Sequence, residues 1–169
     1  MLDKTALMWT IANIGKPFFL SRPRRFGKSL LISTFEAYFK GRRDLFTGLV
    51  VEQLEKKWEE YPVLHLDLNA EKYDSPDRLD AILSNQLTQW EAIYGRGEDE
   101  TTLSSRFLGV IRRASEQAGR GVVVLVDEYD KPLLQAIQNE PLLDSYRSTF
   151  ESFLRCVEEC RPLSSFCFF

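Results

Sequence analysis

The sequence predicts an α/β fold in which a mostly parallel sheet carries helices on both faces. Residues 122–126 (VVVLV) form an unbroken apolar run, which is typical of a strand that helices bury on both sides. Two further strands are predicted at 18–20 and 63–68. Stretches with helical apolar spacing alternate with these strands, and such alternation predicts a parallel sheet with helical connections.

The composition predicts one globular domain. A chain of 169 residues with 44% apolar and 28% charged residues has the size and balance of a single unit. The formal charge of −3 gives no overall nucleic-acid signature. No apolar run reaches membrane-spanning length and no signal peptide is visible, so we expect a cytoplasmic protein.

Histidine and cysteine content restrict the metal chemistry. His65 is the only histidine, which excludes multi-histidine sites, and we expect it to be a structural residue on strand 63–68. Cys156, Cys160 and Cys167 all fall near the end of the chain. Their odd number excludes a fully paired disulfide framework, and the lack of nearby histidines argues against zinc.

Helices are expected on either side of the strands. The first is predicted at 4–14, with Asp3 as its cap, and the others at 30–39, 52–60, 75–94 and 103–118, with a connecting turn at 44–50. The predicted core faces are Leu7, Ile11 and Ile14; Leu30, Leu31, Phe35, Tyr38 and Phe39; and Leu79, Ile82, Leu83, Leu87 and Trp90.

The most informative stretch is 18–34, FFLSRPRRFGKSLLIST. A predicted strand, a tight basic loop, Gly27-Lys28-Ser29 and a predicted helix follow one another in that order. This context is typical of a P-loop, whose backbone N–H groups and helix N-terminus surround nucleotide phosphates. Gly27 would allow close backbone approach, Lys28 would reach the terminal phosphates, and Ser29 would ligate magnesium.

The loop departs from the full P-loop pattern. The first glycine of G-x-x-x-x-G-K-[ST] would fall at Arg22, whose side chain is unfavourable where a turn needs positive φ. Pro23 then fixes φ and removes a donor. Two interpretations stay open: a variant phosphate loop, or an ordinary helix start that follows a solvated basic loop with Arg22, Arg24 and Arg25.

A second half of the same site follows the strand at 122–126. Asp127 and Glu128 end the apolar run in the Walker B arrangement, where the aspartate orders the magnesium shell and the glutamate polarises water. Ligands of open α/β sheets bind at the carboxyl ends of strands, so we expect this pair to lie beside residues 27–29. The alternative is an acidic turn after a core strand.

Other polar residues stand near the ends of the predicted strands. Asp130 is a candidate cap for a helix that Pro132 begins. Asp67 and Asn69 lie near the carboxyl end of strand 63–68.

Several motifs together resemble one family. These are Leu2-Asp3-Lys4-Thr5, RPRRFGKSLLIST, DLFTGL, YPVLHLDL and VLVDEYDKPL. Over residues 1–150 the chain resembles the AAA-ATPase-like family of bacterial and archaeal proteins, in which a P-loop NTPase domain commonly precedes a PD-(D/E)XK nuclease-like domain. The resemblance implies that Arg22 belongs to the family's own loop. It also implies that residues 27–29 are the nucleotide loop and that Asp127 and Glu128 are the acidic pair of the site.

The last part of the chain, 151–169, is expected to be atypical. By the same resemblance, a working enzyme needs a further strand with a polar sensor residue, a downstream helical region and an arginine that completes a neighbour's site. We expect the chain to be truncated before these parts and before the nuclease-like domain. We hypothesise that 151–169 is read out of frame, which sequencing of the locus would test.

The sequence therefore predicts a domain that binds ATP and Mg²⁺, with binding favoured over turnover. The predicted nucleotide contacts are Arg24, Arg25, Phe26, Gly27, Lys28, Ser29 and Leu30; the predicted magnesium ligands are Ser29 and Asp127; the predicted catalytic residues are Lys28 and Glu128. One alternative is a non-catalytic fragment or interaction module that self-associates through an open sheet edge. Another is nucleic-acid binding through a basic set, Arg22, Arg24, Arg25, Lys40, Arg42 and Arg43.

Overall fold

The computed structural model describes residues 3–14, 18, 27–69, 72–159 and 164–168. The helices are α1 (Thr5–Ala12), α2 (Lys28–Phe39), α3 (Val50–Leu54), α4 (Pro76–Tyr94), α5 (Leu103–Ala118), α6 (Asp130–Gln135) and α7 (Glu140–Glu159), with a 3₁₀ turn, η1, at Arg43–Phe46. The strands are β1 (Val63–Asp67), β2 (Val122–Asp127) and β3 (Ser164–Phe168). Within these residues no helix is long and apolar enough to cross a membrane.

The strands form a parallel sheet in the order β1-β2-β3. In its register Val63 lies beside Val123 and Asp67 beside Asp127. The carboxyl ends of β1 and β2 therefore meet at one edge of the sheet. The prediction of an α/β fold with a parallel sheet is confirmed.

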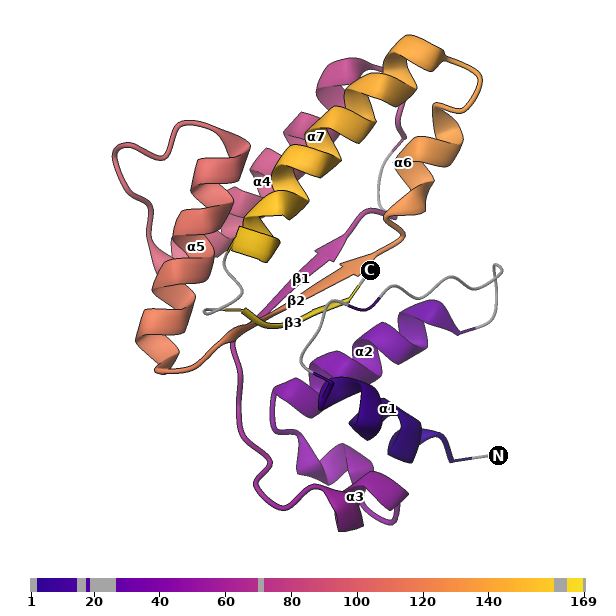
Figure 1. Cartoon of the computed structure of the whole chain (residues 1–169), viewed down its shortest axis with the longest axis vertical. Coiled ribbons are helices and arrows are strands. Elements are labelled where there is room, and N and C mark those ends of the chain that lie inside the picture. The colour runs from indigo at the N-terminus through magenta and orange to yellow at the C-terminus, as the bar shows by residue number, and fades with distance from the viewer. Residues whose placement is uncertain (1–2, 15–17, 19–26, 70–71, 160–163, 169) are drawn as a thin grey trace.

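The two faces of β2 contact different helices (Figure 1). Val122, Val124 and Val126 pack in the core that α4, α5 and α7 share, whereas Val123 and Leu125 pack against α1 and α2. All six residues of β2 are buried, which explains why the strand lacks the alternation of a half-exposed strand.

The last helix and strand alter the expectation for the end of the chain. Phe153, Cys156 and Val157 of α7 are buried, and the Phe153 ring stacks on Phe107 with centroids 4.2 Å apart. β3 follows α7 and pairs with β2, so a further strand is present after 122–126, whereas the truncation before a sensor strand stays a prediction. The out-of-frame origin of 151–169 stays a prediction.

Three local expectations were also wrong. In α1 the buried residues are Met8 and Ala12, while Leu7 and Ile14 are exposed. Leu30 in the first turn of α2 is 65% exposed and is not a core residue. The helix expected at 52–60 is only the short α3, and the segment after it runs as irregular chain to β1. In contrast, α4 and α5 match the predicted ranges.

Hydrogen bonds tie the start of α1 to α3. Lys4 holds the N-cap position of α1 without a side-chain cap bond, so the expectation that Asp3 is the cap was wrong. Asp3 lies one residue before it, where its Oδ1 accepts from the Thr5 N–H at 2.8 Å and its Oδ2 accepts from the Val50 N–H at 2.8 Å. The Thr5 hydroxyl oxygen accepts from the Val51 N–H at 3.1 Å. These bonds hold the pKa of Asp3 below its ordinary value, with the Val50 bond as the main cause.

A buried ion pair joins the α4–α5 loop to α5. Arg113 Nη1 and Nη2 donate to the two Glu100 carboxylate oxygens at 2.6 and 2.8 Å, and the Gly97 N–H donates at 3.0 Å. The hydrogen bonds from Arg113 lower the pKa of Glu100 to about 2. Gly109 leaves room for this carboxylate, since a Cβ there would lie 1.9 Å from Glu100 Oε1.

Candidate functional site

The N-terminus of α2 begins at a glycine whose conformation few other residues adopt. Gly27 is the residue before the helix and has φ +75° and ψ +28°. Among the described residues, a Cβ at Gly27 would meet no atom within 4 Å, so the backbone conformation is the constraint that they place on this position. The N–H groups of the first turn of α2 have no partner within the helix, which is the general basis of anion binding at a helix N-terminus.

Lys28 connects the two halves of the predicted site. Its Nζ lies 3.6 Å from Asp130 Oδ1, and its side chain is 15% exposed. The contact joins the first residue of α2 to the first residue of α6, which directly follows the end of β2. Ser29 and Leu30, in the same turn of α2, are exposed.

Asp127 ends β2 as a buried carboxylate. Its exposure is 6%, and its Oδ1 has no hydrogen-bond partner among the described residues. An unpaired buried carboxylate oxygen is costly, and such atoms commonly contact a cation, water or a donor. Asp127 follows the alternation of Val123 and Leu125, so its side chain is on the α2 face of the sheet.

Glu128 makes the sharp turn from β2 into α6. Its φ is +57°, in the left-handed region that a side chain disfavours. Its carbonyl oxygen accepts from the Lys131 N–H at 3.0 Å, which closes the turn. Backbone strain of this kind concentrates at functional sites.

The loop after β1 is fastened to α6 and α7. Lys131 Nζ donates to the Asn69 carbonyl and to Asn69 Oδ1, and the Tyr73 N–H donates to Gln135 Oε1 at 3.0 Å. Tyr146 of α7 donates to the Ser75 carbonyl at 2.7 Å. These hydrogen bonds hold the end of β1 in a fixed position relative to α6, which follows β2.

A second contact fixes how α2 lies on the sheet. His65 Nδ1 lies 2.9 Å from Glu36 Oε2, which confirms a structural role for this histidine on β1. Burial alone would raise the pKa of Glu36, but the hydrogen bonds from Lys40 and His65 outweigh it and keep that pKa low. With Lys28 at the carboxyl edge and Glu36 lower on the sheet, α2 runs antiparallel to the strands.

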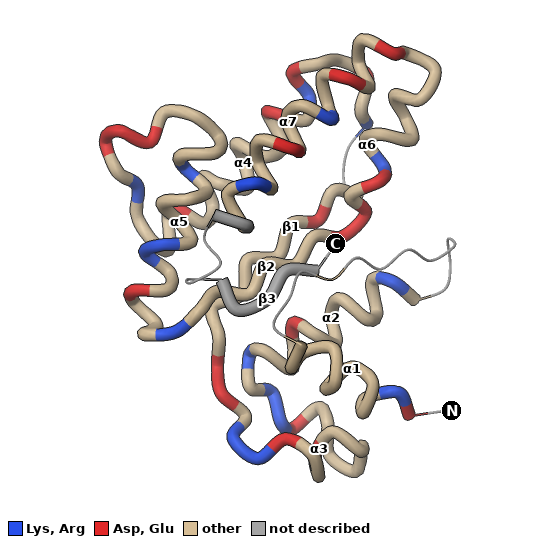
Figure 2. The backbone as a smooth tube through the Cα atoms, in the orientation of Figure 1, with Lys and Arg blue, Asp and Glu red and all other residues tan. Residues whose placement is uncertain are grey.

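The charge distribution suits a magnesium–phosphate ligand. In Figure 2 a basic position marks the start of α2, and acidic positions mark the ends of β1 and β2 and the start of α6. No group of three His, Cys, Asp or Glu residues suited to a metal occurs in the described parts of the chain. Mg²⁺ usually binds through one or two carboxylates, with water and phosphate completing its shell, so the carboxylate of Asp127 suits this ion and Ser29 stays a predicted ligand.

The structure brings together part of the predicted residue set. The contact of Lys28 with Asp130 joins the start of α2 to the residues that directly follow Asp127 and Glu128. Arg24, Arg25 and Phe26, with Arg22 and Pro23, lie outside the described residues. Sequence reasoning left Asp67 and Lys131 out of the site, although the rule that ligands bind at the carboxyl edge already pointed to Asp67.

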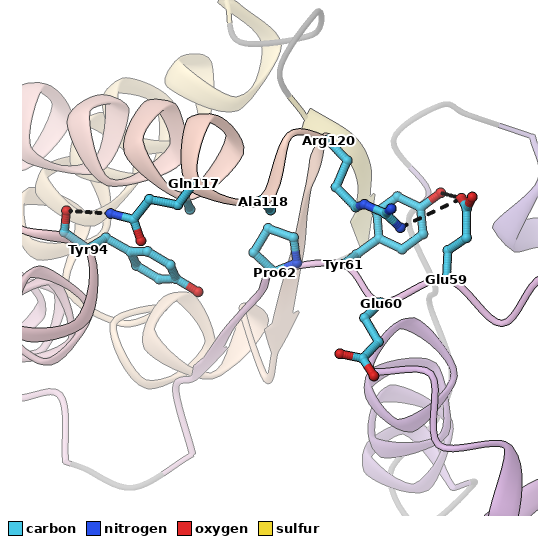
Figure 3. A pocket seen from close by; sticks show the side chains of 9 residues that line it. Glu59, Glu60, Tyr61, Pro62, Tyr94, Gln117, Ala118 and Arg120 are labelled. Atoms are coloured by element: carbon cyan, nitrogen blue, oxygen red, sulfur yellow. Dashed lines mark hydrogen bonds and ion pairs between the residues drawn. The ribbon is translucent and has the colours of Figure 1, made fainter.

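A pocket of about 510 Å³ lies at the opposite edge of the sheet (Figure 3). Pro62, just before β1, and Arg120, just before β2, line it. Arg120 lies over the Tyr61 ring at 5.3 Å and 3.7 Å from Glu59. Because parallel strands begin here, this pocket is separate from the edge that carries Asp127.

Comparison with known proteins places this sequence in a family. A family model described as "Predicted AAA-ATPase" matches residues 1–169. The chain belongs to the AAA-ATPase-like family. This AAA-ATPase-like chain is also similar to an uncharacterized protein in the vnfD 5′ region of Azotobacter chroococcum mcd 1, with 32% identity over 161 residues. The match covers 94% of the chain and 31% of that relative's length. No solved structure matches the chain.

Proposed function

We propose that this AAA-ATPase-like chain binds Mg-ATP through a P-loop site at the carboxyl edge of its sheet. The observation that carries the proposal is the 3.6 Å approach of Lys28 to Asp130. It joins the G-K-S helix start and the acidic end of β2, two stretches far apart in the sequence, in the order that a nucleotide site needs.

Each residue has a role in the proposed site. Gly27 allows the phosphates to approach the backbone, and Lys28 neutralises the β- and γ-phosphate charge. Ser29 and Asp127 hold Mg²⁺, which would supply charge neutralisation on the phosphate oxygens. Glu128 orients a water molecule for attack.

Four further predicted contacts and the extent of the chemistry complete the proposal. Arg24 and Arg25 add positive charge over the phosphates, and Phe26 and Leu30 flank the loop. Binding is favoured over turnover, because transition-state stabilisation needs additional donors around the transferred phosphoryl group. Nucleic acid is a partner only indirectly, through the nuclease-like domain that the family resemblance implies.

Thermal unfolding of the purified chain with and without Mg-ATP tests the proposal. A ligand at a hundredfold excess over its Kd stabilises the folded state by about 2.7 kcal/mol. For a domain of this size that corresponds to a rise in Tm of about 5–11 °C. Lys28→Ala should remove the shift, and Lys57→Ala, which changes an exposed lysine in the segment after α3, should retain it.

Two results would count against the proposal. A cooperative transition that Mg-ATP does not move would exclude a nucleotide site in this chain. Salt-dependent binding to DNA that persists in Lys28→Ala would favour the basic loop as a nucleic-acid surface instead.

A further inference from the structure

Asp67 occupies a position that the proposed function does not use. It ends β1 and lies directly beside Asp127 in the parallel register. Neighbouring strands are about 4.8 Å apart, so the two residues are adjacent across the ladder. Asp67 is exposed, whereas Asp127 is buried.

Both carboxylates are on the face that α2 covers. Leu64 and Leu66 of β1 belong to the core under α4, α5 and α7, so His65 and Asp67 alternate to the other face. The contact between His65 and Glu36 of α2 confirms that alternation. Asp127 lies on the same face.

The direction of α2 brings its first turn to these carboxylates. From the level of Glu36 and His65, β1 advances about 6.6 Å in two residues to Asp67. Over the same direction α2 rises about 12 Å from Glu36 to Lys28. Asp67 therefore lies at a level between the two contacts that fix α2, about 5 Å short of the level of Lys28.

Two like charges side by side on neighbouring strands destabilise a sheet unless a cation lies between them. The buried Asp127 Oδ1 has no hydrogen-bond partner among the described residues, so it leaves an acceptor that a cation at this position could use. The Lys28 ammonium group pairs with Asp130, and the Lys131 ammonium group donates to Asn69. Among the described contacts, neither ammonium group pairs with Asp67 or Asp127.

We propose that Asp67 is a second acidic residue of the magnesium shell, acting beside Asp127 on the α2 face of the sheet. This inference rests on the proposed nucleotide site and adds a ligand-ordering residue to it. Asp67 binds through water or directly, and its charge offsets that of the ion shared with Asp127.

Asp67 also has a structural role, and the experiment must separate this role from the proposed role in the magnesium shell. Its Oδ1 accepts from the Asn69 N–H at 2.8 Å and so shapes the turn after β1. Asp67→Asn keeps an oxygen acceptor for this turn and removes only the charge. Asp67→Ser, whose hydroxyl can accept the same bond, serves as a second variant should the first fold poorly.

The test is a Mg²⁺ titration of Tm at a fixed, saturating ATP concentration, with a series in EDTA. In EDTA, Asp67→Asn should unfold about 1–4 °C higher than the wild type, because like-charge repulsion is lost. With ATP, the Mg²⁺ concentration at half-maximal stabilisation should rise about tenfold. Asp99→Asn, which removes an exposed aspartate from the α4–α5 loop, should match the wild type in both series.

The Mg²⁺ midpoint decides the outcome. If the Mg²⁺ midpoint of Asp67→Asn is within about twofold of the wild-type midpoint, the inference is overturned and the nucleotide site is left intact. A residue that orders the metal shell is expected to change the midpoint more than that. If ATP with Mg²⁺ fails to move the wild-type Tm, the proposed function itself fails and this inference fails with it.

Discussion

Substitution of Glu128 separates the cost of its backbone conformation from the use of its side chain. Its φ of +57° lies in the left-handed region, where a non-glycine residue costs about 1–2 kcal/mol. Glycine avoids this cost but loses about 0.5–1 kcal/mol through the greater freedom of the unfolded chain. Glu128→Gly should therefore stabilise the protein by about 0.5–1 kcal/mol, or about 1–4 °C in Tm.

The assay compares Glu128→Gly with Glu128→Gln, which retains the strained backbone and loses the charge. Circular dichroism should give a higher Tm for the glycine variant and a Tm close to wild type for the glutamine variant. In the proposed site both variants should still gain stability from Mg-ATP, and neither should retain any ATP hydrolysis that the wild type shows. A lower Tm for Glu128→Gly would refute the reasoning, because it would mean that the Glu128 side chain stabilises the turn.

Three further predictions concern the ion pairs. Gly109→Ala should displace Glu100 from Arg113. Breaking this ion pair should cost about 3–5 kcal/mol of unfolding free energy, and the higher helix propensity of alanine should return about 1 kcal/mol. The net loss should lower Tm by about 4–16 °C. The same substitution in a Glu100→Ala background should raise Tm, and a fall there would contradict the clash. Since the pKa of Glu100 is lowered from 4.5 to about 2, its stabilisation is complete above pH 4.5 and should fade toward pH 2, with a flatter Tm profile in Glu100→Gln. Asp130→Asn should release Lys28 and tighten Mg-ATP binding about two- to fivefold, and weaker binding would show that Asp130 itself serves the ligand.

At the carboxyl edge, some features follow from the local sequence and others only from the tertiary structure. The G-K-S helix start and the run ending at Asp127 are local patterns, so the sequence could predict both halves and the edge at which they meet. The side chains that face each other there depend on strand register and on the direction of α2. The sequence placed Asp67 near the end of its strand, but only the register of β1 and β2 places it directly beside Asp127.

Burial differed from the sequence predictions for a related reason. Helical spacing in α1 and α2 marked Leu7, Ile14 and Leu30 as core, but each helix covers only part of the small sheet and leaves these residues exposed. The role of Asp3 in joining α1 to α3 depends on a contact between residues 47 positions apart.

The sequence by itself determined the elements whose signals are strong and local. These are the buried strand predicted at 122–126, the long amphipathic helices α4 and α5, and the helix predicted to follow Gly27-Lys28-Ser29. Only the tertiary structure decided the pairing of Lys28 with Asp130, the shared face of Asp67 and Asp127, and the strained turn at Glu128. The physical reason is that periodicity and capping act within a few residues, whereas ion pairs, register and turn strain are set by packing between distant segments.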